Sequence, residues 1–301
     1  MNMSQNNYNE QSYALSGPSP KTDKRITPIR GDLADISLAG KLFAPHYAVP
    51  QLRICVTSAT MVRAAPDHLA QGASSLSYGE EFAVLDISGD WAWGYCKHDD
   101  YLGYVPTAHL AIITEEMPKP THIVTSVSSM IYTQPKGSAT SIVQLPMGAK
   151  ICITGDEEDG FLPCAQGYMP ASHLSLISDM DVDPVALARR LINVPYCWGG
   201  RSGFAIDCSG LVQLCFGMNG KNLPRDSDMQ EAFVGRQLDD RNQLRVGDLV
   251  FFNGHVGIMA DKDNIIHANS YHMNVTIEPL SIVAQRFASE DGPAITSMKR
   301  I

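Results

Sequence analysis

The chain has 301 residues, 44% of them hydrophobic, which predicts two or three packed globular domains. Its 23 basic and 32 acidic residues give a net charge of -9, which argues against a nucleic-acid-binding surface because such surfaces need clustered Lys and Arg. No apolar stretch is long enough to span a bilayer, and the first residues lack the apolar core of a signal peptide. We therefore expect a cytoplasmic protein with no membrane partner.

The cysteines support the same expectation. There are seven, an odd number, and most lie in apolar stretches where a free thiol behaves as a small hydrophobic group. This distribution favours a reducing compartment over a secreted disulfide scaffold.

The N-terminal part of the chain divides into two segments. Residues 1–25 are rich in Asn, Ser, Gln and Pro, and they predict a disordered tail because few large apolar groups are present to offset the entropy of ordering. Residues 26–50 carry apolar groups without a clear period, and we expect them to pack on the folded body.

The middle of the chain contains an internal repeat. VTSATMVRAAP (56–66) aligns with VTSVSSMIYTQP (124–135), and GYVPTAHLAII aligns with GYMPASHLSLI further on. Short β-rich runs separated by Gly, Asp, Pro and Ser predict two small all-β barrels, over 51–115 and 120–178. The closing G-Y-[VM]-P-x-x-H-L pattern resembles bacterial SH3-like domains, which bind peptides or wall fragments or serve as spacers.

A third domain is predicted over residues 181–301, and it opens with a helix. Asp183 followed by Pro184 is typical of an N-cap and a first helical position, and apolar residues then recur on one face up to Ile192.

Cys208 is the candidate nucleophile of this domain. It precedes apolar residues at helical spacing, so we expect it at a helix start, where the positive dipole end favours the attacking thiolate. Its neighbours Asp207, Ser209 and Gly210 are not apolar, which favours a reactive site over a core cysteine such as Cys215.

Two histidines follow on predicted strands. The sequence predicts strands over 249–252, 255–259 and 264–268, with the last two forming a hairpin. His255 and His267 then lie nearly opposite each other, so that one imidazole can take the thiol proton while the other fixes its tautomer.

A zinc site is the alternative for these three side chains. No CxxC or HExxH spacing accompanies Cys208, His255 and His267, so we predict neither a metal nor a cofactor.

The motifs YCWGGRSGFAIDCSG, LPRDS, VGDLVFF, HVGIM and IIHA occur in this order between about residues 183 and 278. Together they resemble the NlpC-type cysteine peptidases of the papain-like superfamily. The resemblance implies an α+β domain with Cys208 as nucleophile, His255 as base and His267 as the third polar residue. Members of that family hydrolyse bonds made by the γ-carboxyl of D-glutamate in bacterial cell-wall peptides.

Two SH3-like modules before such a domain further resemble the γ-D-glutamyl-L-diamino acid endopeptidases of wall recycling, which require a free N-terminal L-alanine. This resemblance implies substrate-binding roles for residues of the catalytic domain and of the first module: Tyr196, Ser209, Asp226, Ser227, Glu80 and Tyr101. A buried ammonium needs a carboxylate partner, which Asp226 and Glu80 could supply. Alternatively, Asp226 or Ser227 caps a helix over 229–233, and Glu80 is a solvated turn residue.

The second module lacks the matching Glu and Tyr, so we expect it to be mainly structural. The function implied is hydrolysis of the γ-D-glutamyl-L-diamino acid bond of murein peptides, with release of L-Ala-γ-D-Glu. Two rivals stay open. One is an amidase or endopeptidase of similar fold that acts on intact wall, and the other is a non-catalytic protein that binds wall fragments through its SH3-like modules.

Overall fold

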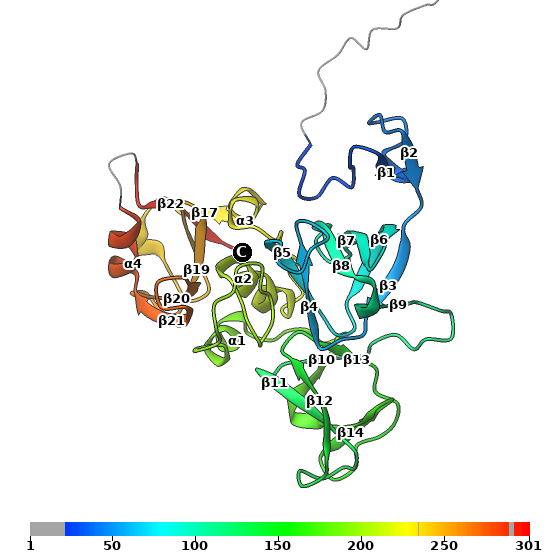
Figure 1. Cartoon of the computed structure of the whole chain (residues 1–301). Helices are drawn as coiled ribbons and strands as arrows, with labels where there is room; N and C mark the ends of the chain where they lie inside the picture. The colour runs from blue at the N-terminus through cyan, green and yellow to red at the C-terminus, as the bar shows by residue number, and fades with distance from the viewer. Residues whose placement is uncertain (1–21, 234, 289–291) are drawn as a thin grey trace, which may run out of the picture.

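The computed structural model describes residues 22–233, 235–288 and 292–301. They form an N-terminal segment, two β modules and a helix-and-sheet domain, coloured from blue through cyan and green to red in Figure 1. Within these ranges no helix is long and apolar enough to cross a membrane.

The N-terminal segment, residues 22–50, lies against the first β module. Its strands β1 (Leu33–Asp35) and β2 (His46–Ala48) pair in parallel. Arg30 binds the carboxylate of Asp86 at 2.8 Å, and its guanidinium lies 4.7 Å from the centre of the Trp93 ring. An ion pair and a cation–π contact therefore hold this segment to the module.

The first module is a seven-stranded antiparallel sheet in the order β5-β4-β8-β7-β6-β3-β9. Side chains that alternate along these strands, among them Val62, Leu76 and Phe82, form its buried core. The strands are β3 (Gln51–Cys55), β4 (Ala59–Arg63), β5 (Gly72–Ser77), β6 (Glu81–Ser88), β7 (Trp91–Cys96), β8 (Leu102–Pro106) and β9 (Leu110–Ile112).

The second module repeats these pairings in two smaller sheets, β13-β10-β16 and β12-β11-β15-β14. Strand β10 pairs with β16 as β3 pairs with β9, and β11 lies between β12 and β15 as β4 lies between β5 and β8. The sequence repeat therefore corresponds to a repeated strand arrangement. The strands are β10 (His122–Val124), β11 (Ser128–Tyr132), β12 (Ser141–Pro146), β13 (Lys150–Ile151), β14 (Phe161–Cys164), β15 (Gly167–Pro170) and β16 (Leu174–Leu176).

The histidine of the repeated G-Y-[VM]-P-x-x-H-L pattern has the same role in both modules. In each module this histidine ends a short 3-10 helix. His109 Nδ1 lies 2.8 Å from Thr60 Oγ1, and His173 Nδ1 lies 3.0 Å from Ser129 Oγ. Each hydrogen bond ties the end of the module to a strand near its beginning, β4 in the first module and β11 in the second, so both histidines are structural.

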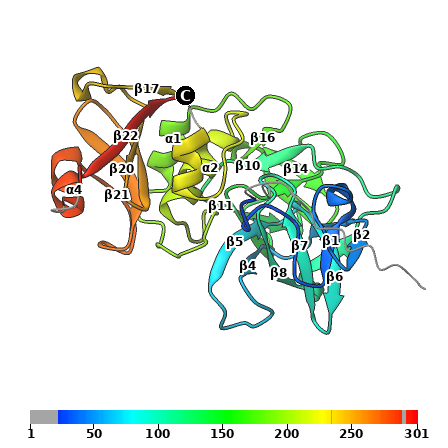
Figure 2. The ribbon, with the colours of Figure 1, turned by 90° about the horizontal axis from the view of Figure 1, so that it is seen from above.

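The third domain is a six-stranded antiparallel sheet in the order β17-β22-β18-β19-β20-β21. Figure 2 shows α4 on one face of this sheet and α1 and α2 on the other. Neighbouring residues of β18 point to opposite faces: Leu249 and Phe251 pack with α1 and α2, whereas Val250 and Phe252 pack with α4. The elements are α1 (Pro184–Arg190), α2 (Cys208–Gly217), α3 (Ser227–Phe233), α4 (Leu280–Phe287), β17 (Arg236–Gln237), β18 (Leu249–Phe252), β19 (His255–Met259), β20 (Asn264–Asn269), β21 (Asn274–Pro279) and β22 (Ile295–Arg300).

Several local predictions are confirmed in this domain. Asp183 caps α1, because its Oδ1 accepts a hydrogen bond of 2.9 Å from Val185 N, and Pro184 is the first helical residue. The strands predicted over 249–252 and 255–259 have these bounds, and β20 extends one residue beyond the predicted end.

Candidate active site

Cys208 is the first residue of α2, as the sequence predicts, and its side chain is buried. Asp207 caps this helix, since its Oδ1 accepts a hydrogen bond of 2.7 Å from Gly210 N. Its Oδ2 accepts another, of 2.8 Å, from Gly199 N in the loop before the helix. One carboxylate therefore fixes both the helix start and the Gly-rich loop around the Cys208 sulfur.

The resting state of Cys208 differs from the expected thiolate. Burial raises the pKa of the thiol to about 12, and the adjacent Asp207 carboxylate adds to the rise. Backbone N–H groups of Val256 and Ser209 act in the opposite direction without offsetting the burial. Desolvation outweighs the helix terminus, so the group is a neutral thiol that needs a proton acceptor to become a nucleophile.

His255 and His267 form the predicted hydrogen bond. His255 Nε2 lies 2.8 Å from His267 Nδ1. The register of β19 and β20 pairs Ile258 with Ile266, which places the two histidines diagonally across the ladder rather than directly opposite. The imidazoles therefore meet at the start of β19.

Glu278 on β21 continues this chain of hydrogen bonds. Its Oε2 lies 2.9 Å from His267 Nε2 and 2.8 Å from Arg286 Nη1 of α4. The hydrogen bonds from Arg286 in particular lower the pKa of Glu278 to about 2, so it is a carboxylate at neutral pH.

The direction of each hydrogen bond follows from this charge. Burial lowers the pKa of His267, and burial followed by the nearby His267 lowers that of His255 to about 3, so both rings are neutral at pH 7. The Glu278 carboxylate can only accept, so His267 donates from Nε2 and accepts at Nδ1. His255 then donates from Nε2, which leaves its Nδ1 without a proton and able to act as a base.

The His255 ring and the Cys208 thiol are neighbours at the start of β19. The sulfur of Cys208 faces the backbone N–H of Val256, the residue after His255. The His255 ring stacks on Phe287 of α4, with centroids 5.1 Å apart and planes at 15°. Among the described residues, the hydrogen bonds of His255 do not include one from the Cys208 sulfur, so proton transfer requires the two groups to come closer.

The low pKa of His255 predicts that the stability of this domain falls with acidity. Only the unfolded state binds the proton below pH 6.5, so the free energy of unfolding decreases as pH falls, by up to about 1.4 kcal/mol per unit. We expect the free energy of unfolding, measured with urea, to fall between pH 7.5 and pH 5 in both the wild type and His255→Gln. The fall should be about 2 kcal/mol smaller in His255→Gln than in the wild type, because the variant lacks the buried imidazole. Equal losses in both proteins would contradict the assigned neutral, buried imidazole.

A cavity of about 450 Å³ opens onto Cys208. The N-terminal segment, the first module and the catalytic domain all contribute to its wall, through residues that include Arg25, Gln71, Gly72, Tyr101, Trp198, Cys208, Ser209, Asp226, Ser227, Asp228 and Gly254. Of the six predicted substrate-binding residues, the structure brings Tyr101, Ser209, Asp226 and Ser227 together here.

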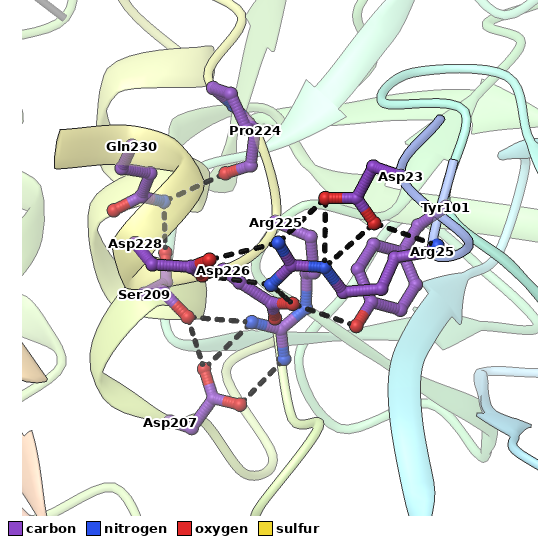
Figure 3. Close-up of polar contacts among 10 residues, drawn as sticks. All are labelled: Asp23, Arg25, Tyr101, Asp207, Ser209, Pro224, Arg225, Asp226, Asp228 and Gln230. Atoms are coloured by element: carbon purple, nitrogen blue, oxygen red, sulfur yellow. Dashed lines mark hydrogen bonds and ion pairs between the residues drawn. The ribbon is translucent and has the colours of Figure 1, made fainter. Parts of the chain in front are cut away.

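Asp226 joins three parts of the chain across this cavity. Its Oδ2 accepts hydrogen bonds of 2.8 Å from Tyr101 Oη and from Arg25 Nη1, as Figure 3 shows. Helix α3 begins at Ser227. The Asp226 carboxylate binds the side chains of Tyr101 and Arg25 rather than capping this helix.

The predicted disordered tail needs a correction at its end. Residues 1–21 lie outside the described part of the chain, but Asp23 and Arg25 are held in place. The Arg25 carbonyl accepts a hydrogen bond of 2.8 Å from Leu102 N, and the side chain binds Asp23, Asp226 and Asp228. Hydrogen bonds and ion pairs fix these residues. A prediction of disorder from low apolar content does not take such polar contacts into account.

Arg225 is a buried cation next to the nucleophile that the sequence did not indicate. Its guanidinium donates hydrogen bonds of 2.9 and 2.6 Å to Asp207, and Nη1 donates another of 2.9 Å to Ser209 Oγ. A buried carboxylate without such a partner would be strongly unfavourable. Arg225 therefore offsets the charge of Asp207 and fixes Ser209, which is itself buried.

Tyr196 packs against the core that contains Cys208, and it is not among the residues that line the cavity. Burial, followed by the proximity of Cys208, raises the pKa of its phenol to about 12. The tyrosine is thus a neutral neighbour of the thiol.

Glu80 lies elsewhere, buried between the first module and the catalytic domain. Its Oε2 accepts a hydrogen bond of 2.9 Å from Ser77 N and pairs with Arg201. Burial alone would raise the pKa of Glu80, but the charges of Arg201, His98 and Lys150 lower it to about 2. The carboxylate is occupied by this pairing and does not line the cavity at Cys208, in contrast to the role that the resemblance implies.

Arg201 belongs to the same loop as Gly199, which also packs on the first module. A Cβ on Gly199 would lie 2.9 Å from the carbonyl carbon of Gly72, and φ here is +81°. Only glycine permits this approach. The loop before α2 is therefore docked on the first module by close backbone packing and by the Arg201–Glu80 pair.

Within the described ranges, one group of His, Cys, Asp or Glu has ligand atoms close enough together for a metal: Cys96, His98 and Asp99. Asp99 already accepts hydrogen bonds from Gln213 Nε2 and from Tyr101 N. His98 Nε2 lies 3.2 Å from Asp99 Oδ2. Pairing within the group accounts for its proximity, and the group lies apart from Cys208, His255 and His267.

Two comparisons with known families agree with this architecture. Residues 193–288 match the NlpC/P60 family, and residues 62–110 match the family described as bacterial dipeptidyl-peptidase Sh3 domain. The first range contains Cys208, His255, His267 and Glu278, and the second contains Tyr101. Residues 120–178 lie outside both, so a second SH3-like barrel stays a prediction.

Individual relatives span most of the chain. A protein of Lysinibacillus sphaericus named dipeptidyl-peptidase 6 is 24% identical over 72% of this chain and 87% of its own. One of Bacillus cereus named gamma-D-glutamyl-L-lysine dipeptidyl-peptidase is 26% identical over 67% of this chain and 69% of its own. A crystal structure of an NlpC/P60 family protein from Bacillus cereus shares the fold, with a TM-score of 0.69 at 20% identity, over 83% of this chain and 99% of that one. The chain therefore carries an NlpC/P60 family peptidase domain, and a bacterial SH3 domain of the dipeptidyl-peptidase type precedes it.

Proposed function

We propose that the protein is a cysteine peptidase that hydrolyses the γ-D-glutamyl-L-diamino acid bond of murein peptides with a free N-terminal L-alanine, releasing L-Ala-γ-D-Glu. One observation carries the proposal. The cavity at Cys208 has Asp226 and Tyr101 on its wall, so a thiol and a carboxylate lie within one site. The name of the Bacillus cereus relative, gamma-D-glutamyl-L-lysine dipeptidyl-peptidase, supports the same substrate class.

In the first chemical step, the Cys208 sulfur attacks the γ-carbonyl carbon of D-glutamate while its proton passes to His255 Nδ1. A sulfur–carbon bond forms and the carbonyl oxygen becomes an oxyanion, which backbone N–H groups at the start of α2 stabilise. The carbon–nitrogen bond then breaks, and His255 returns the proton to the leaving amine.

In the second step, water attacks the thioester. His255 takes a proton from the water, the carbon–sulfur bond breaks, and the sulfur regains a proton. The relay from Glu278 through His267 stabilises the imidazolium of His255 in both steps, because the carboxylate carries the compensating charge.

Recognition of the substrate ammonium determines which peptides the site accepts. We assign its binding to Asp226, whose carboxylate is already fixed by Tyr101. A buried ammonium without a carboxylate partner would cost several kcal/mol, so a cavity with the Asp226 carboxylate on its wall favours a peptide that ends in a free amine. An enzyme for intact wall would have to admit a blocked N-terminus.

A cytoplasmic location forms part of the proposal. All seven cysteines lie within the described residues and are free thiols, which supports a reducing compartment.

The test of this function is blocking the substrate amine. We expect the purified protein to cleave L-Ala-γ-D-Glu-L-Lys or its meso-diaminopimelate counterpart, and acetylation of the alanine to lower kcat/KM by about 10²-fold or more, because the acetylated peptide cannot pair with Asp226. Liquid chromatography of the reaction products measures both rates. Equal rates on free and acetylated peptides would point to an enzyme of intact wall, and binding without cleavage of either would point to a non-catalytic wall-binding protein.

A further inference from the structure

Arg25 reaches the candidate amine site from outside the two domains that form it. Its backbone oxygen accepts a hydrogen bond from Leu102 N of β8 in the first module, and its side chain extends to Asp226 in the catalytic domain. The residue is one-third exposed, at the rim of the cavity that opens onto Cys208. It therefore bridges the two domains above the site.

The guanidinium is held by three carboxylates. It forms paired hydrogen bonds with Asp23, of 3.0 and 2.7 Å, and with Asp228, both of 2.8 Å, and a single one of 2.8 Å with Asp226. Figure 3 shows the planar group between these acids. Two bidentate pairs fix its orientation, so the bond to Asp226 has a defined direction.

This arrangement leaves one oxygen of Asp226 for a ligand. Arg25 and Tyr101 both donate to Oδ2, and among the described residues the hydrogen bonds to this carboxylate do not include one to Oδ1. The carboxylate is thus held by one oxygen while the other is free to accept from an ammonium.

The charges at the site are compatible with a cationic ligand while Arg25 is in place. Asp23, Asp226 and Asp228 carry three negative charges against the single positive charge of Arg25, so the cluster retains a net charge of -2. The Tyr101 phenol is neutral, since burial and then the Asp226 charge raise its pKa. An approaching ammonium is therefore attracted overall.

From these contacts we infer that Arg25 is a positioning residue of the substrate-amine site, which makes the N-terminal segment part of the specificity machinery. It holds Asp226 so that the free carboxylate oxygen meets the ammonium of the peptide. The inference rests on the proposed function, because the ammonium belongs to the proposed substrate. It adds a third part of the chain to a site otherwise formed by Tyr101 and Asp226.

The test compares Arg25→Ala and Arg25→Lys with a matched control, Arg30→Ala. Arg30 lies in the same segment and also binds carboxylates and an aromatic ring, but it lines a different cavity. For Arg25→Ala we expect KM for the free-amine tripeptide to rise about tenfold or more with kcat near the wild-type value, since a charge-assisted hydrogen bond positions the carboxylate. Arg25→Lys should recover part of the affinity, and Arg30→Ala should keep the wild-type KM.

Three outcomes would overturn the inference. An unchanged KM in Arg25→Ala would show that Asp226 needs no such support. A lower KM would show that the guanidinium competes with the substrate ammonium instead of assisting it. An equal rise in Arg30→Ala would assign the effect to attachment of the segment rather than to the Arg25 side chain. A wild-type protein that does not cleave the peptide would refute the proposed function itself, so the two failures are distinguishable.

Discussion

Replacing Cys208 by alanine is expected to lower peptide cleavage by about 10⁴-fold or more, because the variant has no atom that can form the thioester. Cys208→Ser should be nearly as inactive. The Cys208 thiol has a pKa of about 12 and must lose its proton during attack. A serine hydroxyl is a weaker acid still, so its deprotonation by His255 is less favourable. Initial rates on the free-amine tripeptide measure both variants.

Cys215→Ala is the matched control for this experiment. Cys215 lies on the same helix two turns later, fully buried in the core between α2 and the sheet. Its loss should reduce stability slightly and leave kcat near the wild-type value. Full activity in Cys208→Ala or Cys208→Ser would assign the chemistry to another group. Inactivity in Cys215→Ala would show that any loss of a buried cysteine from α2 inactivates the protein, which would contradict a specific role for Cys208.

Replacing Glu278 by glutamine is expected to lower kcat by about 10²-fold or more with KM near the wild-type value. In the variant, a neutral amide replaces the carboxylate oxygen that accepts from both His267 Nε2 and Arg286 Nη1. The negative charge that compensates the His255 imidazolium is lost. Because the amide can present either its oxygen or its nitrogen to His267, the tautomer that leaves His255 Nδ1 without a proton is no longer enforced. The function of His255 as a base is therefore weakened without any change at Cys208.

Steady-state kinetics on Glu278→Gln tests this relay, with Asp239→Asn as the control. Asp239 is an exposed carboxylate of the same domain, so its change removes an equal charge away from the histidines. Circular dichroism at the assay pH establishes that both variants are folded. A wild-type kcat in Glu278→Gln would show that the tautomers of His255 and His267 are set without the carboxylate.

Local sequence patterns were sufficient to predict where Cys208, His255 and His267 lie in the fold. The Cys208 helix start, the Asp183 cap and the His255–His267 hydrogen bond all arise from contacts within a helix turn or a hairpin, whose geometry is fixed by short-range periodicity. The resemblance to a known family added Tyr101 and Asp226, which the structure places in direct contact. Their catalytic and binding roles stay predictions.

Longer-range pairing was not accessible from the sequence. The partner of Glu80 is Arg201, 121 positions away, and Arg25 meets Asp226 across 201 positions. Nothing in the local pattern around Glu80 or Arg25 specifies such a partner. The sequence therefore predicts a substrate-binding role for Glu80 and a disordered tail that includes Arg25.

The protonation states follow from burial, which the sequence does not provide. A cysteine at a helix start suggests a thiolate, yet the burial of Cys208 keeps the proton on the sulfur. Glu278 likewise has no sequence signal, because it meets His267 and Arg286 only through the pairing of β20 with β21 and the approach of α4.

Mass spectrometry of the products from L-Ala-γ-D-Glu-L-Lys and from its meso-diaminopimelate counterpart tests the central claim most directly, with the wild type and Cys208→Ala run side by side. The account predicts L-Ala-γ-D-Glu and the free diamino acid from the wild type, and intact peptide from the variant. Release of alanine, cleavage at another bond, or the same products from both proteins would contradict it.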